Sequence, residues 1–214
     1  MFRRAETGVQ ATTNSEALLP EQQSQLFARL TETLPGDRPF SVLDVGPGVA
    51  DTVTFFADYR CQLHFADLFS DLPAPIPEGE DLTEQQKQNH YQQYFSELLS
   101  FLPDTSSIDL ILFWDLFNYM NGTAIAGLAM ALAPHLHSGT KGHGFVQRDR
   151  QKVPPEYSYG VRSATSLLAK PLTRENLPRH CHGQSSLERQ LHSLKIDRGV
   201  LMLDGRLEFV LRAS

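Results

Sequence analysis

Residues 41–51 read SVLDVGPGVAD, a short apolar run followed by two closely spaced glycines. The run from Val42 to Val45 favours β-structure, which predicts a buried strand. Gly46 and Gly48 follow where the chain must turn sharply, because glycine adopts backbone angles closed to other residues and lets a ligand approach closely. The segment therefore predicts a strand, a tight turn and the start of a helix.

An acidic residue follows the next apolar segment at the spacing of a βαβ unit. Residues 62–66 predict a second strand, and Asp67 ends it about 20 residues after the glycines, where doubly wound sheets place an acid that binds ribose hydroxyls. A dinucleotide fingerprint would have its third glycine at position 51, but Asp51 would repel a pyrophosphate. We therefore expect a nucleoside ligand without a phosphate cradle. The alternative is a ligand-free turn whose glycines only satisfy backbone geometry.

The same turn resembles motif I of the class I S-adenosylmethionine-dependent methyltransferases, an acid followed by G-x-G, here DVGPG at residues 44–48. The resemblance implies S-adenosylmethionine as cofactor. Asp44 would face the amino group of its methionine end and Asp67 its ribose. The cofactor-binding residues expected on this basis are Asp44, Val45, Gly46, Pro47, Gly48, Asp67, Leu68 and Trp114.

Composition favours a cytoplasmic protein with one main domain. The chain has 214 residues, 41% of them hydrophobic, which is enough for a full core. Two cysteines are too few for a disulfide framework or a cysteine zinc site. The run His180-Cys181-His182 resembles a metal triplet, but neighbouring side chains point in different directions, so no metal is expected. The N-terminus lacks the apolar core of a secretory signal, and the other apolar runs are too short or too interrupted to cross a membrane.

Charge is unevenly distributed along the chain. Residues 1–140 carry six Lys/Arg and eighteen Asp/Glu, whereas residues 141–214 carry thirteen and seven, so the net charges are −12 and +6. The basic C-terminal third favours an anionic substrate or an acidic partner, and the alternative is a surface on which the charges mix. Nucleic acid is not expected as a partner because the whole chain is acidic. RNA modification through the basic third is a weaker alternative.

Periodicity predicts further helices and strands around the βαβ unit. Residues 1–15 are polar and aperiodic, which predicts disorder, and residues 16–36 predict an amphipathic covering helix that ends at Pro35-Gly36. Thr83 and Gln86 form a capping-box pattern that starts a helix ending near residue 102. The remaining predicted elements are a buried strand at 108–114, a helix at about 122–136, a strand at 142–146, and a hairpin of 199–203 with 206–211.

The order of these elements predicts an α/β fold over residues 37–214. We expect a Rossmann-like, mostly parallel sheet with helices on both faces and a C-terminal antiparallel hairpin, which resembles the class I methyltransferase fold. That family has one more strand than we find, since here the chain passes from a proline-rich loop through one helix to Ile108. The sheet is therefore expected to lack an edge strand, or to have a short one near Leu72 or Ile76, and the adenine contact is left unassigned.

The candidate acceptor site lies where the strand at 108–114 ends. Asp115 is the candidate catalytic residue, as a base for an acceptor hydroxyl or amine, and a helix N-cap is the equal alternative. Asn118, Tyr119 and Arg148 are candidate substrate residues. Residues 148–175 mix cations with aromatics and are the candidate substrate lid, with a plain surface connection as the alternative.

The sequence thus predicts an S-adenosylmethionine-dependent methyltransferase that acts on a small or medium-sized acceptor molecule. The alternative is a non-catalytic protein of the same fold that binds a protein partner, with or without the nucleoside. The recognisable motif favours the enzyme, whereas the missing strand and the lack of an acceptor-specific motif favour the alternative.

Overall fold

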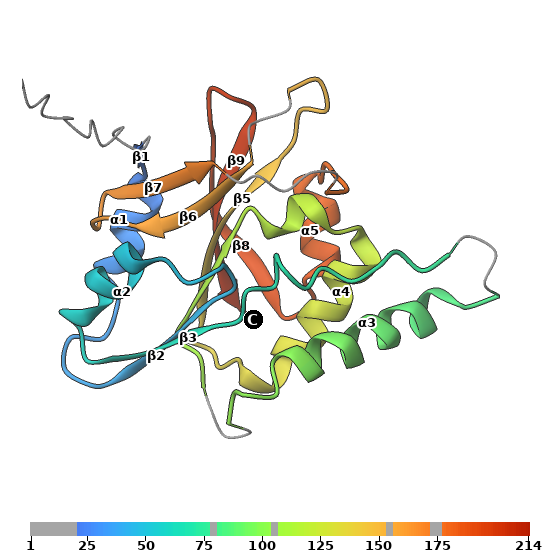
Figure 1. Ribbon diagram of the computed structural model, residues 1–214, viewed down its shortest axis with the longest axis horizontal. Coiled ribbons are helices and arrows are strands. Elements are labelled where there is room, and N and C mark those ends of the chain that lie inside the picture. Colours follow the sequence, from blue (N-terminus) through green and yellow to red (C-terminus); the bar gives the residue numbers. More distant parts are fainter. Residues whose placement is uncertain (1–20, 78–80, 104–106, 153–155, 172–176) are drawn as a thin grey trace, which may run out of the picture.

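The computed structural model of the chain describes residues 21–77, 81–103, 107–152, 156–171 and 177–214 (Figure 1). The larger of its two sheets has six strands in the order β3-β2-β4-β5-β9-β8. They are β2 (Phe40–Asp44), β3 (Cys61–Phe65), β4 (Leu110–Trp114), β5 (Lys141–Gln147), β8 (Leu194–Leu201) and β9 (Arg206–Ala213). The first four strands in this order run parallel, and β9 is antiparallel to both of its neighbours. This arrangement confirms the predicted Rossmann-like sheet with a C-terminal antiparallel hairpin.

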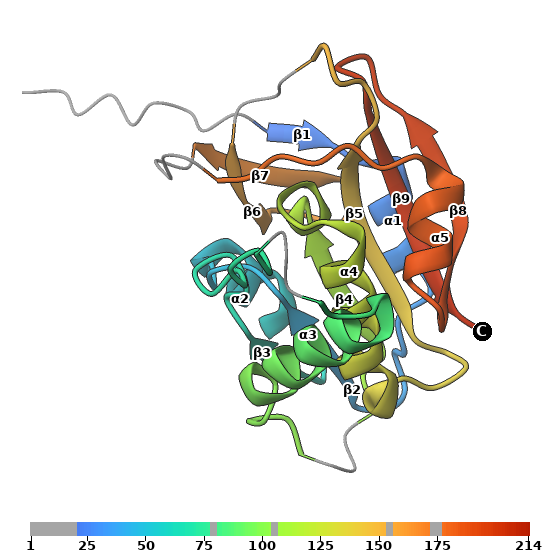
Figure 2. The ribbon, with the colours of Figure 1, turned by 90° about the vertical axis from the view of Figure 1, so that its right-hand side faces the viewer.

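Helices cover both faces of the six-stranded sheet, as predicted. In Figures 1 and 2, α1 and α2 lie on one side of the sheet, and α3, α4 and α5 lie on the other. The bounds are α1 (Gln25–Thr31), α2 (Ala50–Ala57), α3 (Glu84–Leu98), α4 (Gly122–Leu132) and α5 (Gln184–Gln190), with short 3-10 helices η1 (Leu116–Tyr119) and η2 (Ala133–His135). Among the described helices, none is long and apolar enough to span a bilayer.

The edge of the sheet at β3 has no further strand in the described residues between β3 and β4. Leu72 and Ile76 lie in irregular chain that packs on the core. Two tyrosines of α3 hold this proline-rich loop, because the Tyr94 hydroxyl donates to the Asp71 carbonyl and the Tyr91 hydroxyl accepts from the Ile76 amide. The loop therefore lies where an edge strand was expected to be short or missing.

The predicted capping box of α3 is confirmed. Thr83 accepts a hydrogen bond from the Gln86 amide, and the Gln86 side chain accepts one from the Thr83 amide. This reciprocal pair satisfies two backbone donors that the first turn of a helix leaves without partners. Local sequence therefore places the start of α3 without help from the rest of the fold.

The N-terminal helix begins later than predicted, because residues 21–23 of the expected helix form a strand. β1 (Glu21–Gln23) pairs antiparallel with β7 (Ser166–Pro171), and only then does α1 begin. Ser24 ends the strand and caps the helix by accepting from the Phe27 amide at 2.8 Å. Pairing with a distant strand therefore overrides the helical periodicity of this segment. Residues 1–15, predicted to be disordered, lie outside the described residues.

Two of the three strands of the smaller sheet, β6 (Tyr157–Val161) and β7, come from the segment predicted as a lid. The order of this sheet is β1-β7-β6, and all pairs are antiparallel. It packs on the first turn of α2, where the Val161 amide donates to the Thr52 hydroxyl at 3.1 Å. Arg162 also pairs with Asp51 at 3.3 Å. The small sheet therefore covers the start of the helix that follows the glycine turn.

Candidate functional site

Three predicted acids lie at one edge of the larger sheet. Asp44 is the last residue of β2, Asp67 follows β3 by two residues, and Asp115 directly follows β4. Because parallel strands all end at the same edge, the fold brings these three side chains to one side of the molecule. The glycine turn lies at the same edge, between β2 and α2.

Asp44 is buried beneath the glycine turn and bonded to the chain itself. Asp44 is only 1% exposed. Its Oδ1 accepts hydrogen bonds from the Gly46 amide at 2.8 Å and from Trp114 Nε1 at 2.6 Å. Burial raises the pKa of Asp44 to about 7, although both hydrogen bonds lower it. This carboxyl therefore gains or loses its proton near neutral pH.

The Trp114 indole fills the space beside Gly46. A Cβ placed on Gly46 would lie 3.0 Å from Trp114 Cδ1 and 3.1 Å from Nε1, so the missing side chain makes room for this ring. The other face of the indole stacks on Tyr159 of β6, with 5.6 Å between the ring centroids and 10° between the planes. Trp114 is 1% exposed. The side of the turn that would face a methionine group is thus packed with protein atoms.

Backbone strain holds this indole in place. Trp114 has a φ of 52°, in the left-handed region that bulky residues rarely adopt. The pairing of β4 with β5 also shifts register between Leu112 and Trp114, and such irregularities redirect side chains at strand ends. Strained residues cluster at functional sites, which makes Trp114 a candidate site residue on backbone geometry alone.

The ribose side of the predicted site is more open. Gly48 is exposed, Pro47 and Asp67 are half-buried, and a Cβ on Gly48 would lie 3.2 Å from the Phe65 ring. Asp67 has a φ of 38°, and its Oδ2 accepts from the Ser70 hydroxyl at 2.7 Å. The remaining predicted cofactor residues, Val45 and Leu68, are fully buried. A ligand can thus reach the predicted ribose acid from solvent.

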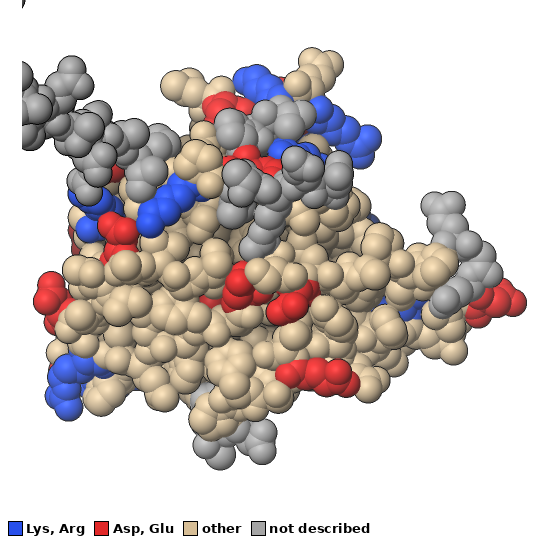
Figure 3. Space-filling view, viewed as in Figure 1, with Lys and Arg blue, Asp and Glu red and all other residues tan. Residues whose placement is uncertain are grey.

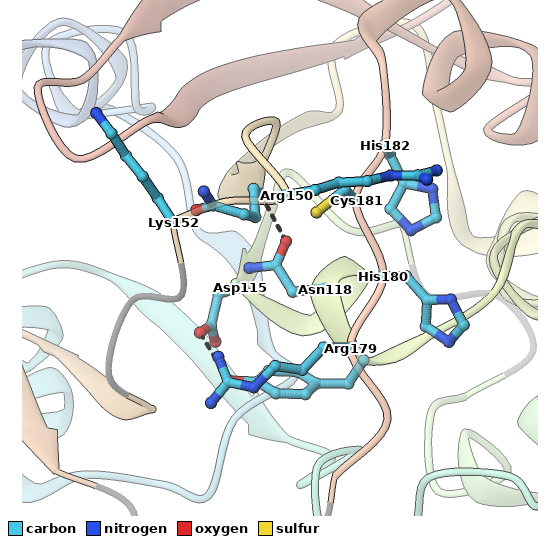
Figure 4. A pocket seen from close by; sticks show the side chains of 10 residues that line it. Asp115, Asn118, Arg150, Lys152, Arg179, His180, Cys181 and His182 are labelled. Carbon is cyan, nitrogen blue, oxygen red and sulfur yellow. Dashed lines mark hydrogen bonds between the residues drawn. The ribbon is translucent and has the colours of Figure 1, made fainter.

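A cavity of about 400 Å³ lies where β4 and β5 end (Figure 4). This volume falls within the range of small-molecule sites, about 300 to 1,000 Å³. Three chain segments meet there: the start of η1, the chain that leaves β5, and the segment before α5. The lining residues are Asp115, Asn118, Tyr119, Gln147, Arg150, Lys152, Arg179, His180, Cys181 and His182.

Asp115 has the properties of a proton acceptor in this cavity. The residue is 4% exposed, its Oδ2 accepts from the Tyr119 hydroxyl at 3.2 Å, and its Oδ1 has no hydrogen-bond partner within the described residues. Burial raises the pKa of Asp115 to about 7, with the Tyr119 bond opposing this shift. Its side chain makes no capping hydrogen bond to η1. The N-cap alternative for Asp115 therefore has no capping hydrogen bond in this structure.

Asn118 joins the three segments that form the cavity. Its Oδ1 accepts from the Gln147 amide at 2.7 Å, and its carbonyl accepts from the His180 amide at 2.7 Å. The His182 amide donates in turn to the Gln147 carbonyl at 3.2 Å. Among the predicted substrate residues, Asn118 and Tyr119 therefore line the cavity, and the side-chain oxygen of Asn118 is used to position β5.

Cations lie on the outer wall of the cavity. Arg150 and Lys152 are exposed, and Arg179 pairs with Glu156 at 2.7 Å. Figure 3 shows lysine and arginine side chains at the upper end of the molecule, with acidic side chains beside them. Arg148, the predicted substrate residue, is exposed and does not line the cavity.

The two histidines of the cavity are uncharged near neutral pH. Burial lowers the pKa of both His180 and His182, and their rings stack with 6.1 Å between centroids. His182 Nε2 lies 3.0 Å from the carbonyls of Phe117 and Met120, which makes this nitrogen the donor. Sequence reasoning did not assign these histidines, Arg179 or Gln147 to the site. For Arg179 and the two histidines, the only signal in the sequence was the polar character of residues 179–182.

Comparisons with known proteins give structural similarities only. No protein family model and no curated protein sequence matches the chain. Among solved structures, it is similar to an S-adenosylmethionine-dependent methyltransferase from Clostridium acetobutylicum, at 13% identity over 86% of this chain and 87% of that one, with a TM-score of 0.47. A 1,6-didemethyltoxoflavin-N1-methyltransferase of Burkholderia thailandensis gives 16% identity over 88% and 75%, with a TM-score of 0.42. These values are too low to assign an activity or a cofactor to this chain.

Proposed function

We propose that the chain is an S-adenosylmethionine-dependent methyltransferase that acts on a small or medium-sized acceptor bound in the 400 Å³ cavity. The observation that carries the proposal is Asp115. Its buried Oδ1 has no hydrogen-bond partner among the described residues, and Asp115 lines a cavity at the same sheet edge as the motif I-like turn. Perturbed carboxyls in cavities are characteristic of catalytic acids and bases.

The residues at the glycine turn fit the nucleoside part of this cofactor. Asp67 and Gly48 reach solvent at the carboxyl ends of β2 and β3, which is where doubly wound sheets hold ribose. The methionine part fits only after the Trp114 indole moves away from Gly46, because the two now lie in contact. We expect cofactor binding to include this displacement.

The chemistry that the chain itself must supply is limited. S-adenosylmethionine, when bound, provides a methyl group already activated by its sulfonium, so the protein mainly aligns the two reactants and excludes water. Asp115 Oδ1 is placed to receive the proton that an acceptor hydroxyl or amine loses. The Tyr119 hydroxyl, bonded to Oδ2, orients the carboxyl for this role.

One observation favours the second candidate, a non-catalytic protein of this fold that binds a partner. Trp114 packs against the turn that the resemblance assigns to the methionine end of the cofactor, and it donates to the same oxygen of Asp44 that accepts from Gly46. If the indole never leaves this position, the turn holds no complete cofactor. In that case the fold serves as a scaffold.

A titration separates the two candidates. Trp114 is the only tryptophan in the chain, so its fluorescence reports directly on the glycine turn. We expect S-adenosylmethionine to shift this emission and to give a calorimetric binding signal. Incubation with methyl-labelled cofactor and a small-molecule extract should then yield label in an acceptor. Binding without transfer would favour the scaffold, and no binding together with unchanged emission would end the enzymatic proposal.

A further inference from the structure

Two buried oxygen atoms near the cavity lack hydrogen-bond partners within the described residues. They are Asp115 Oδ1 and Gln147 Oε1, on residues 4% and 5% exposed. The Gln147 amide nitrogen donates to the Asp149 carbonyl at 2.8 Å, which fixes the orientation of that side chain. Buried acceptors without donors are costly, and in a cavity wall they indicate a ligand that supplies hydrogen-bond donors.

The chain that leaves β5 and the segment before α5 contribute cationic side chains to the cavity. Arg150, Lys152 and Arg179 bring three cationic side chains to the same cavity, and Glu156 neutralises the last of these. Lys152 Nζ donates to the Leu203 carbonyl at 3.2 Å, and Figure 4 shows this amine pointing away from Arg150 and Asp115, so Arg150 is the cation left to meet a ligand. The two histidines add no charge near neutral pH, as their pKa directions require. The cavity therefore attracts an anionic group on its cationic side.

We infer that the cavity binds a small organic acid that carries a hydroxyl or amino group. Its carboxylate or phosphate meets Arg150, and its hydroxyl or amine donates to Asp115 Oδ1 and Gln147 Oε1. Such a ligand satisfies both walls at once. A neutral molecule gains nothing from the cations, and an acid without a donor leaves the buried oxygens unpartnered.

The small organic acid would be the acceptor substrate of the proposed methyltransferase, and this identification rests on the proposed function. The hydroxyl or amine beside Asp115 is then the group that receives the methyl group. Binding itself requires neither cofactor nor methyl transfer. The two proposals can therefore fail separately.

Calorimetry without cofactor tests the inference with four matched probes. The acid with a donor is 4-hydroxyphenylacetate. Tyrosol replaces its carboxylate by an alcohol, phenylacetate removes its hydroxyl, and 4-hydroxybenzylphosphonate replaces the carboxylate by a phosphate-like group. We expect the first probe to bind about 10-fold or more tightly than tyrosol and than phenylacetate. The ratio between the first and the last probe shows whether the site prefers a carboxylate or a phosphate.

Variants of the lining residues test whether 4-hydroxyphenylacetate binds in the cavity. Arg150→Gln should reduce binding of 4-hydroxyphenylacetate to the level of tyrosol, whereas Arg148→Gln, an exposed cation that does not line the cavity, should leave it unchanged. Gln147→Met should reduce the preference for 4-hydroxyphenylacetate over phenylacetate.

The inference is overturned if tyrosol binds as tightly as the acid, if no probe binds, or if Arg148→Gln has the same effect as Arg150→Gln. The probe ratios of the unaltered protein decide the matter even if a variant does not fold. Because cofactor is absent throughout, a negative result leaves methyl transfer to a neutral acceptor standing.

Discussion

Trp114 donates its indole N–H to Asp44 Oδ1 across 2.6 Å, and both residues are 1% exposed. The bond links the carboxyl ends of β2 and β4 and closes one side of the glycine turn. Removing this bond should therefore lower the stability of the fold at the predicted cofactor site.

Trp114→Phe should lower the free energy of unfolding by about 1–3 kcal/mol, because the phenyl ring keeps the stacking but removes the donor to a buried carboxyl. Urea unfolding measures this loss. In the Asp44→Asn background the amide oxygen is a weaker acceptor, so the same substitution should cost less there. Equal losses in both backgrounds would show that the bond between the two side chains contributes nothing.

Asp67→Ala should weaken S-adenosylmethionine binding by about 1–3 kcal/mol, because a ribose contact is lost. Calorimetry gives the dissociation constants. The control is Asp71→Ala, an exposed acid four residues further along the same loop, which should bind like the parent. If Asp67→Ala and its control bind equally well, Asp67 does not hold the ribose.

Asp115→Asn should lower kcat by about 10²- to 10⁴-fold while leaving cofactor binding intact, because it removes the proposed proton acceptor. The parent rate should rise as pH increases through about 7, since the base acts only in its ionised form and burial raises its pKa to that value. Initial rates from pH 5.5 to 9 with any identified acceptor measure this. A variant that keeps the parent rate and pH profile would exclude Asp115 as the base.

The contribution of Asp44 and Asp115 to folding stability should fall as pH rises from about 4 to about 7. The pKa values of Asp44 and Asp115 are raised by burial from 3.8 to about 7, so the folded state binds more protons than the unfolded chain across that window. Each group therefore contributes stability that is complete below the unfolded pKa and lost as pH approaches the folded one. The loss is at most about 1.4 kcal/mol per pH unit for each carboxyl.

Asp44→Asn isolates one of these contributions, because asparagine keeps an oxygen for Gly46 and Trp114 but does not titrate. The difference in unfolding free energy between variant and parent should grow in favour of the variant as pH rises from 5 to 7. Urea midpoints at several pH values provide the measurement. A difference that stays constant with pH would mean that Asp44 has an ordinary pKa in the folded protein.

Much of the fold was predictable from short stretches of sequence. The buried run that became β4, the capping box of α3 and the Asp204-Gly205 turn between β8 and β9 each depend on residues close together in the chain. The same holds for the glycine turn after β2 and for the acid two residues after β3. Local backbone preferences and the periodicity of apolar residues are sufficient to specify such features.

The packing around the candidate site was not predictable in this way. Nothing near residue 21 indicates that it pairs with β7, and nothing near Trp114 indicates that its backbone is left-handed or that its ring lies against Gly46. The cavity likewise forms only because residues 179–182 return to η1 and the end of β5. These contacts join residues tens of positions apart, and long-range pairing has no signature within any single stretch of chain.

The amino-acid sequence alone therefore specifies the α/β order of elements, the turn and the three acids at the strand ends, since each depends on neighbouring residues. Tertiary structure decides which of those acids are buried, and thus which have raised pKa values: Asp44 and Asp115. It also decides that an indole lies beside Gly46 and that Asp115 lines the same cavity as Arg150 and Arg179. The reason is physical, because desolvation and side-chain contact depend on every segment that folds over a residue.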